Sequence, residues 1–550
     1  MNVLLAPVRL SPLTEPTSQT AHLDDAHVGD IHGALGSIDE HDFAPRTTLR
    51  KRFMTLMAIV GPGIIVMVGD NDAGAFGTYT QAGQNYGTSL LWTLLLLVPV
   101  LYVNQEMVLR LGAVTGVGHA RLIFERFGKF WGAFSVIDLF LLNALTIVTE
   151  FIGITLGLDY LGLPRGWGVA AAGVVIVAAA STGNFRRFEG FMLALVVGSL
   201  ALVPIVLFAH PPVGRIAHDF LIPQMPKGKL SDIMLLIIAI VGTTVAPWQL
   251  FFQQSYIIDK RVTPRFMSYG KVDLWIGIGI VILGAVAMMA FTAAAFEGGA
   301  GFGNFTDAAG VARGLEAHAG RLPGILFAIA LIDASVIGAG AVSLATAYAI
   351  SDVFSLKHSL HRKPTDAIGF YVVYAGLIAI AAALVLIPGT PLGLLTNAVQ
   401  TLAGVLLPSA TVFLLLLCND REVLGPWVNG RWVNLFTGAV VAVLVMLSVI
   451  LTAATLYPSL SEKVILGVLG GGSVLAFLVW AAFTLLNRGK EKVIDRAGRD
   501  NWRMRPLTQL TTPPMSTSRR IWMSVLRGYL LLATGLVLFR IVGLAFGKGY

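Results

Sequence analysis

Residues 69–74 read GDNDAG and interrupt an apolar segment, with IIVMV before them and AFGTYTQAG after them. Two carboxylates, Asp70 and Asp72, and the amide of Asn71 would therefore lie at membrane depth. Charge at that depth costs about 3 kcal/mol per residue on insertion scales, so such side chains usually face protein or water and serve a function. Their oxygens are hard ligands that favour a bound cation. An alternative is that Asp70 or Asp72 caps the helix that follows the break.

The composition is that of a membrane protein. Of 550 residues, 55% are hydrophobic and 13% are charged, and the mean hydropathy is +0.76. Several apolar runs reach the roughly 20 residues that span a bilayer as a helix, which excludes a soluble enzyme. We therefore expect an all-α polytopic protein of the cell membrane, in contact with the lipid bilayer. The net charge of +8 is dispersed over short connectors, so we expect no nucleic-acid partner.

Hydropathy, with Gly, Pro and charge clusters as boundaries, predicts about twelve spans. Their approximate limits are 53–79, 89–109, 131–158, 166–182, 190–209, 232–257, 272–296, 322–352, 367–388, 391–418, 433–457 and 463–486. A last apolar segment, 524–546, is either a thirteenth span or a helix lying on the membrane surface.

Loop charge predicts the orientation and the domain limits. If the N-terminus is cytoplasmic, the loops on that side carry 15 Lys and Arg residues against 7 on the opposite side, in line with the positive-inside rule. The chain then divides into a disordered cytoplasmic tail (1–52), a transporter core of spans 1–10 (53–425), spans 11 and 12 (426–487), and a cytoplasmic segment with the possible extra helix (488–550). The tail holds four His residues among acidic ones, and it either gathers metal ions or is an inert solvated segment.

A second break is expected in the sixth span, where residues 242–247 read GTTVAP. Both breaks fall in the first span of a five-span block. Interrupted segments at matching positions of two halves indicate a transporter site near the midplane, where unwound helices free their carbonyl groups. An odd number of spans per block makes the two halves inverted in topology.

The residues around the first break, GPGIIVMVGDNDAGAFGTYTQAGQNYGTSLLW (61–92), resemble the first span of the NRAMP divalent-metal transporters. The resemblance continues in RLGAVTG (110–116), EFIG (150–153), FRRFEGF (185–191) and TVAPWQLFFQQS (244–255), and further to residue 425. It implies the leucine-transporter-like fold with 5+5 inverted repeats and with helices 1 and 6 broken. It also implies alternating access, and it places Asp72 on the family's metal-binding aspartate.

Two departures from the family pattern bear on the choice of metal. Ala75 stands where the family has a ligating asparagine, and Ala246 stands where it has a ligating methionine. Methionine is a soft ligand that suits transition metals, whereas Mg²⁺ prefers oxygen and gives up its water reluctantly. The combination resembles the NRAMP-related magnesium transporter branch.

Proton coupling is expected to be weak or absent. Trp248 replaces a family histidine, and of the acidic pair in span 3 only Glu150 remains, as a possible relay. Thr243 matches the position that offers a backbone carbonyl to the metal. Gln249 is expected to line the site or its inner exit.

Gln400 and Asn397 lie three residues apart on one face of span 10. They either close the metal site or form ordinary interhelical hydrogen bonds.

The sequence thus predicts a transporter, not an enzyme, that imports Mg²⁺ and Mn²⁺ by alternating access without a bound cofactor. One alternative is a proton-coupled Mn²⁺/Fe²⁺ importer. Another is a cation-coupled symporter of amino acids or organic solutes with the same fold. The oligomeric state is not predicted.

Overall fold

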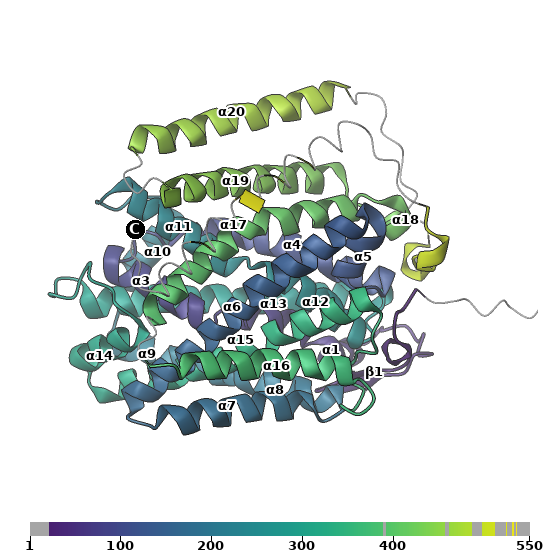
Figure 1. The fold of residues 1–550 in the computed structure, drawn as a ribbon, viewed down its shortest axis with the longest axis horizontal. Helices are drawn as coiled ribbons and strands as arrows, with labels where there is room; N and C mark the ends of the chain where they lie inside the picture. Colours follow the sequence, from purple (N-terminus) through teal and green to yellow (C-terminus); the bar gives the residue numbers. More distant parts are fainter. Residues whose placement is uncertain are drawn as a thin grey trace, which may run out of the picture.

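The computed structural model describes residues 21–388, 392–456, 461–486 and 498–511, and six isolated residues between 524 and 539. Most of the predicted segment 524–546 therefore lies outside the described residues. Figure 1 shows long helices running side by side along the horizontal axis, with connecting segments at the two ends. The all-α multi-span fold expected from hydropathy is confirmed, and each of the twelve predicted spans overlaps one helix or a run of consecutive helices.

The helices of the first half are α1 (Leu49–Ile59), α2 (Pro62–Val68), α3 (Ala73–Tyr86), α4 (Trp92–Thr115), α5 (His119–Phe127), α6 (Lys129–Leu161), α7 (Arg165–Ala180), α8 (Phe185–Gly198), α9 (Leu202–Ala209) and α10 (Val213–Leu221). The second half comprises α11 (Leu230–Thr244), α12 (Pro247–Asp259), α13 (Met267–Phe296), α14 (Ala308–Ala319), α15 (Arg321–Phe354), α16 (Ile368–Val385) and α17 (Leu392–Cys418). These are followed by α18 (Arg421–Leu424), α19 (Arg431–Leu456) and α20 (Glu462–Leu486). Six short 3₁₀ turns are also present among the described residues.

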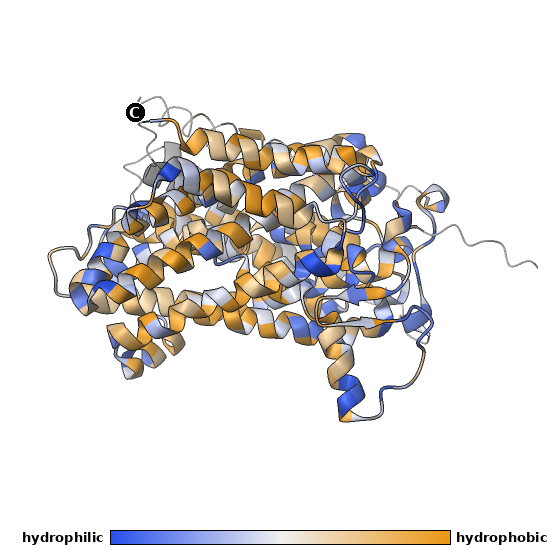
Figure 2. Ribbon diagram, turned by 90° about the horizontal axis from the view of Figure 1, so that it is seen from below, coloured by the Kyte–Doolittle hydropathy of each residue, from blue (hydrophilic) through white to orange (hydrophobic). Residues whose placement is uncertain are grey.

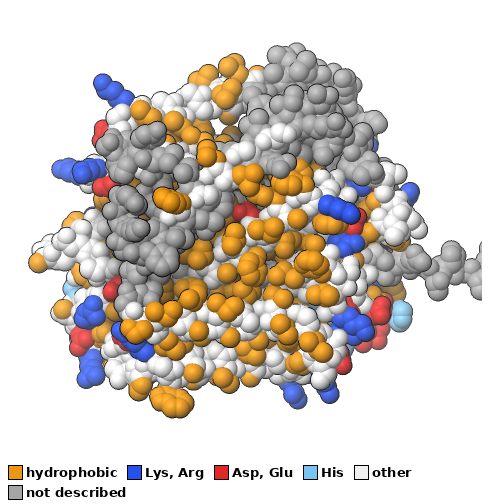
Figure 3. Space-filling model, viewed as in Figure 1, with side chains coloured by type: hydrophobic (Ala, Val, Ile, Leu, Met, Phe, Trp, Pro, Cys, Tyr) orange, Lys and Arg blue, Asp and Glu red, His pale blue; other side chains and the backbone are white. Residues whose placement is uncertain are grey.

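The surface fits a bilayer. Hydrophobic residues follow the middle of the helices in Figure 2, and in Figure 3 charged side chains gather toward the two ends of the visible face. Among the described residues, eight helices are long and apolar enough to cross a membrane, or nine if α1 and α2 form one bent span. α7 is a shorter apolar helix, and so is the described apolar part of α17.

Both predicted helix breaks are present, and local sequence explains them. A third bend, which was not predicted from the sequence, separates α1 from α2; they meet at an angle of 51° around Gly61, whose φ of 149° is readily available only to glycine. Pro62 then opens α2, where its missing N–H costs nothing. The α2–α3 break is formed by residues 69–72. α11 ends at Thr244, and Pro247 begins α12 in the same way.

The broken helices lie in the centre of the bundle. α2 and α3 pack on α13, α12 packs on α4 and α15, and α6 packs along α15. Gly153 and Gly338 allow this last contact, because a Cβ atom on Gly153 would overlap Ser335 and Ala73, and one on Gly338 would lie 2.7 Å from the Glu150 carboxyl carbon. The unwound segments of both broken helices are therefore enclosed by α4, α6, α13 and α15.

The N-terminal region differs from its prediction as a disordered tail. Residues 31–33 (β1, Ile31–Gly33) pair antiparallel with residues 36–38 (β2, Gly36–Ile38), with Ile31 opposite Ile38. Both isoleucines are buried, as are Asp24 and His27. The prediction of disorder over residues 1–52 is therefore wrong for residues 21–52, because this polar segment finds apolar and charged partners on the helix ends.

Candidate metal site

The three polar side chains of the α2–α3 break point toward three different helices. Asp70, Asn71 and Asp72 are all buried, with exposed fractions of 0%, 5% and 4%. Asp70 contacts α12, Asn71 contacts α13, and Asp72 contacts α6. The break thus connects three walls of the enclosed centre.

Asp72 is the N-cap of α3, one of the two roles that the sequence left open for it. Its Oδ1 accepts a hydrogen bond of 2.8 Å from the Ala75 amide and so caps α3. Glu150 on α6 lies beside Asp72, and Glu150 Oε2 accepts from the Ala73 amide at 3.1 Å. The carboxyls of Asp72 and Glu150 thus both accept hydrogen bonds from the first turn of α3.

Asp70 provides a second carboxylate on the opposite side of the break. It accepts a hydrogen bond from the Gln249 amide on α12. Gln249 in turn accepts from Gln105 Nε2 on α4 at 3.0 Å. The chain of two amides fixes Gln249 with its nitrogen toward the carboxylate, so Asp70 is oriented by α4 and α12 together.

Asn71 is directed away from these carboxylates. Its Nδ2 donates to the Val281 carbonyl on α13 at 3.2 Å, and Gly284 leaves the room for it, since a Cβ there would overlap the Asn71 amide. The amide group therefore braces the break against α13, while its Oδ1 has no hydrogen-bond partner among the described residues.

The α11–α12 break supplies the facing side. Ala246 is buried and precedes Pro247 as the N-cap of α12 without a side-chain hydrogen bond. Trp248 is buried beside the first break, where a Cβ on Gly69 would lie 3.5 Å from the indole ring. Thr244 bonds Tyr79 of α3 at 2.7 Å and so connects the two broken helices directly.

Several buried polar atoms around the two breaks have no hydrogen-bond partner among the described residues. Besides Asn71 Oδ1, four such atoms surround the breaks: Asp70 Oδ2, Glu150 Oε1, Thr243 Oγ1 and Trp248 Nε1. Buried polar atoms are nearly always satisfied, so a cluster of orphans indicates room for an ion or water. Three of the four are oxygens, which suits a hard cation.

Side chains alone do not complete a metal cage here. No group of three or more His, Cys, Asp and Glu residues with metal-binding geometry occurs in the described part of the chain. Thr243 lies in the last turn of α11, where helix geometry leaves carbonyl groups without helical partners. Asn397 and Gln400 belong to α17, but their side chains lie outside the described residues.

The site is closed in this structure. A cavity of about 20 Å³, the space of about one water, adjoins it on the side of α3, α6 and α14, lined by Ala73, Gly153 and Asp307 among others. The near-complete burial of Asp70 and Asp72 shows that neither face has an open route to them.

Two residues of this region were missed by the sequence interpretation. Gln105 is fully buried in α4, and Tyr79 joins α3 to Thr244. The signal was present for Gln105, because an amide within a membrane span usually has an interhelical partner, although Asn104 and Glu106 beside it gave no reason to single it out. No comparable signal marks Tyr79.

Comparisons with known proteins agree with this arrangement. The family model described as natural resistance-associated macrophage protein-like (Nramp) matches residues 63–454. A divalent metal cation transporter MntH from Ralstonia nicotianae is 30% identical over 395 residues, which cover 68% of this chain and 86% of that protein. The MntH of Deinococcus radiodurans is 27% identical over 450 residues, covering 79% and 95%.

A solved structure shows the same fold. A manganese transporter from Eremococcus coleocola superposes with a TM-score of 0.64 at 20% identity, covering 83% of this chain and 98% of that one. The leucine-transporter-like fold is thereby confirmed. The match over most of the chain shows that this protein belongs to the NRAMP family, a multi-pass membrane transporter of divalent metal cations and not an enzyme.

Proposed function

We propose that this transporter imports Mg²⁺, and Mn²⁺ as well, by alternating access and with weak or no coupling to protons. The observation that carries the proposal is the pair of alanines at the two breaks. Ala75 and Ala246 offer no side-chain ligand where the resembling family members place asparagine and methionine. Without the thioether, the remaining ligands are oxygens, which favour Mg²⁺ relative to a softer transition metal.

The buried carboxylates would hold the ion. Asp72 and Asp70 come from opposite sides of one break, and the carbonyl groups of Thr243 and Ala246 come from the other break. Mg²⁺ commonly binds through one or two carboxylates and keeps several waters. The orphaned oxygens of Asp70, Glu150 and Thr243 are suited to receive such waters.

The direction of transport follows from charge. We assign the face that carries the N-terminus to the cytoplasm, because its loops are the more basic ones. A divalent cation gains about 4.6 kcal/mol on moving inward through 100 mV, at about 2.3 kcal/mol per charge. A negative interior can therefore drive uptake without protons.

Proton-coupled uptake of Mn²⁺ or Fe²⁺ is the second candidate. It is favoured by the relatives, which include a manganese transporter, and by the contact between Asp72 and Glu150. A proton shared by these two groups would be released when a cation binds Asp72, and release on the inner side would couple the two fluxes.

Flux measurements in liposomes separate the two candidates. The reconstituted chain is expected to admit both Mg²⁺ and Mn²⁺, detected by internal dyes, at rates that differ little with and without a pH gradient. Absence of Mg²⁺ entry, or uptake only with the gradient, overturns the proposal in favour of the second candidate.

A single substitution tests the selectivity argument. Ala246→Met restores the soft ligand and is expected to shift the Mg²⁺/Mn²⁺ rate ratio toward Mn²⁺ by about tenfold, the equivalent of about 1.4 kcal/mol. Ala82→Met, at a buried alanine further along α3, is the matched control for added volume. An unchanged ratio in Ala246→Met contradicts the assignment of this position to metal choice.

A further inference from the structure

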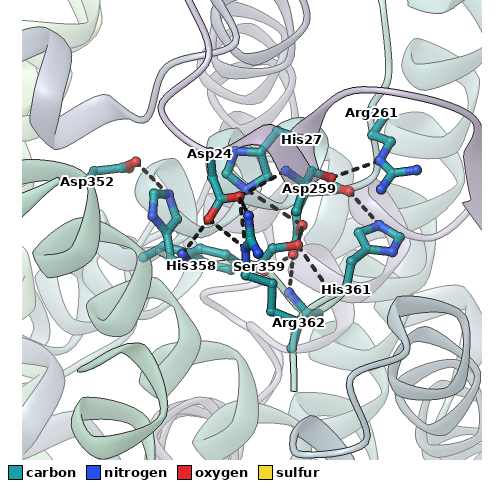
Figure 4. A network of polar contacts seen from close by, with 12 residues as sticks. Asp24, His27, Asp259, Arg261, Asp352, His358, Ser359, His361 and Arg362 are labelled. Carbon is teal, nitrogen blue, oxygen red and sulfur yellow. Dashed lines mark hydrogen bonds and ion pairs between the residues drawn. The ribbon is translucent and has the colours of Figure 1, made fainter. Parts of the chain in front are cut away.

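The folded N-terminal segment, residues 21–48, crosses the ends of several helices on one face of the molecule. We call it the N-terminal strap. Figure 4 shows its Asp24 and His27 in a polar network with Asp259 and Arg261, which end α12, and with His358 to Arg362, which follow α15. The strap thus contacts one of the half-helices that form the metal site.

The contacts to α12 involve both charge and backbone. Arg261 donates to the carbonyl groups of Ala26 at 3.0 Å and Asp30 at 2.9 Å. His27 Nε2 lies 3.7 Å from Asp259 Oδ1, and both side chains are buried. The strap therefore holds the end of α12 in two ways: Arg261, just beyond the helix, bonds the strap backbone, and His27 of the strap lies against Asp259.

The contacts to the connection between α15 and α16 are stronger. Asp24 accepts hydrogen bonds from Arg362 Nε, at 2.9 Å, and from Arg362 Nη2, at 2.5 Å, and one from the His358 amide at 2.8 Å. His358 Nε2 pairs with Asp352 at 3.0 Å. Bidentate, charge-assisted pairs of this kind are the strongest hydrogen bonds in proteins.

A further anchor attaches the strap to α8 and to the α1–α2 junction. The Ala34 amide donates to Glu189 Oε2 at 2.7 Å. Glu189 pairs at 2.7 Å with Lys260, and Lys260 donates to the Val60 carbonyl at 2.8 Å. Glu189 and Lys260 are fully buried, so the strap, α8, α12 and the beginning of the first broken helix meet at one ion pair.

These anchors bear on transport because of where α2 and α12 lead. α2 ends at the first break and begins next to Val60, which Lys260 contacts, whereas α12 begins at the second break and ends at Asp259 beside the strap. An ion leaves the closed site toward the face that carries the strap only if the ends of α2 or α12 separate from α8 and α15. The strap and its network bridge those same ends.

The strap also has space behind it. A cavity of about 460 Å³ lies between the strap, the end of α4, the end of α12 and the C-terminal residues 500–506, lined by His22, His27, Ile258 and Arg503 among others. Protein interiors contain few voids larger than a water molecule. The strap is packed on α1 and α8 around the buried Ile31 and Ile38, whereas its part beside the cavity is therefore held mainly by polar anchors.

We propose that the N-terminal strap is a latch that keeps the metal site closed toward the face carrying the N-terminus, and that Asp24 and His27 must leave the ends of α12 and α15 before that side opens. The inference rests on the family's transport of divalent cations and not on which cation is carried.

Cysteine accessibility tests the latch. Ser359 is fully buried within the network, so Ser359→Cys, in a background with the single Cys418 replaced by Ala, reports opening through its rate of reaction with a small methanethiosulfonate reagent in detergent micelles. Asp24→Ala is expected to raise that rate about tenfold or more, since it removes several charge-assisted hydrogen bonds. Asp25→Ala is the matched control, because Asp25 is exposed and should leave the rate unchanged.

Equal labelling rates in Asp24→Ala and Asp25→Ala overturn the proposal. If Asp24→Ala is not recovered folded, Arg362→Ala removes the same anchor from the other side, with the exposed Lys363→Ala as its control. The exchange of charges in Asp24→Arg with Arg362→Asp is expected to return slow labelling. The ratio of Mg²⁺ to Mn²⁺ uptake should not change in any latch variant, so a failure of the latch is distinguishable from a failure of the proposed cation.

Discussion

Buried polar groups gather in two regions of this transporter, and the protein satisfies them to different degrees. In the strap network, both carboxylate oxygens of Asp24 and of Asp259 accept hydrogen bonds. Around GDNDAG, by contrast, Asp70 and Glu150 each keep an oxygen without a partner among the described residues. In the strap network, His27 Nε2 and Asp352 Oδ2 lack a hydrogen-bond partner among the described residues, but the two central carboxylates are fully bonded. These carboxylates are suited to hold helices together, whereas the open carboxylate oxygens around the break are suited to receive a cation.

The largest effect is expected from removing the anchoring carboxylate of the site. Asp72→Ala should abolish uptake of both cations, by about a hundredfold or more, because a buried charge loses its partner. The measurement is dye-reported flux in liposomes. Asp333→Asn, a carboxylate of α15 outside the site, is the control and should retain transport. Persisting flux in Asp72→Ala would contradict the assignment of the break region, rather than the strap network, to cation binding.

Breaking the buried ion pair behind the strap should instead affect stability. Lys260→Met leaves Glu189 buried without its partner, and we expect a loss of about 3–5 kcal/mol in the free energy of unfolding. Thermal unfolding in detergent measures it. The double variant Lys260→Met with Glu189→Leu should recover much of the loss, because it removes the orphaned charge. A double variant less stable than Lys260→Met would show that the pair contributes more than mutual neutralisation.

Sequence reasoning could predict the breaks but not the directions of their side chains. Asp72, as a helix cap, and Pro247, at the start of a helix, indicate helix ends by local chemistry alone. Which helix Asp70, Asn71 and Asp72 each face depends on the backbone path through residues 69–72, and no helical period applies there. The separation of Asn71 from the two carboxylates therefore appears only in the structure.

The strap was missed for a different reason. Its composition is polar, as in disordered segments, and its partners are remote in sequence. Arg261 lies 235 residues from Ala26, and Arg362 lies 338 residues from Asp24. Local patterns carry no information on such pairs, so burial of Asp24 and His27 was not predictable from the chain alone.

The latch should depend on pH in both directions. Burial lowers the pKa of His358, but Asp352, the hydrogen bonds of the imidazole and Asp24 together raise it to about 9. The stabilisation from the His358–Asp352 pair is therefore complete below the ordinary pKa of 6.5 and is lost as pH rises through 9. Burial and repulsion from His358 lower the pKa of His27 to about 4, although Asp259, Asp24 and Asp352 act to raise it. The stabilisation from the neutral, buried His27 is therefore complete above pH 6.5 and is lost as pH falls toward 4. Labelling of Ser359→Cys should be slowest near pH 6.5.

Away from that minimum, the labelling rate is expected to rise by up to about tenfold per pH unit, the limit for one linked proton. Rates must be divided by those of an exposed reference, Lys363→Cys, because thiol reactivity itself increases with pH. A normalised rate that changes in only one direction between pH 4.5 and 9 would assign the pH dependence to a single histidine.

The smallest effect is expected from the amide that orients Gln249. Gln105→Leu removes the hydrogen bond of 3.0 Å that turns the Gln249 amide nitrogen toward Asp70, and a neutral bond of this kind contributes about 1 kcal/mol. Apparent affinity for Mg²⁺ and Mn²⁺ should therefore fall about fivefold for both ions, with an unchanged maximal rate, because the carboxylates themselves remain. The adjacent Asn104→Leu, also buried in α4, is the matched control for loss of an amide. If Gln105→Leu and Asn104→Leu weaken cation binding equally, Gln105 acts through helix packing. If only Gln105→Leu weakens it, Gln105 of α4 supports the cation site by orienting Gln249 toward Asp70.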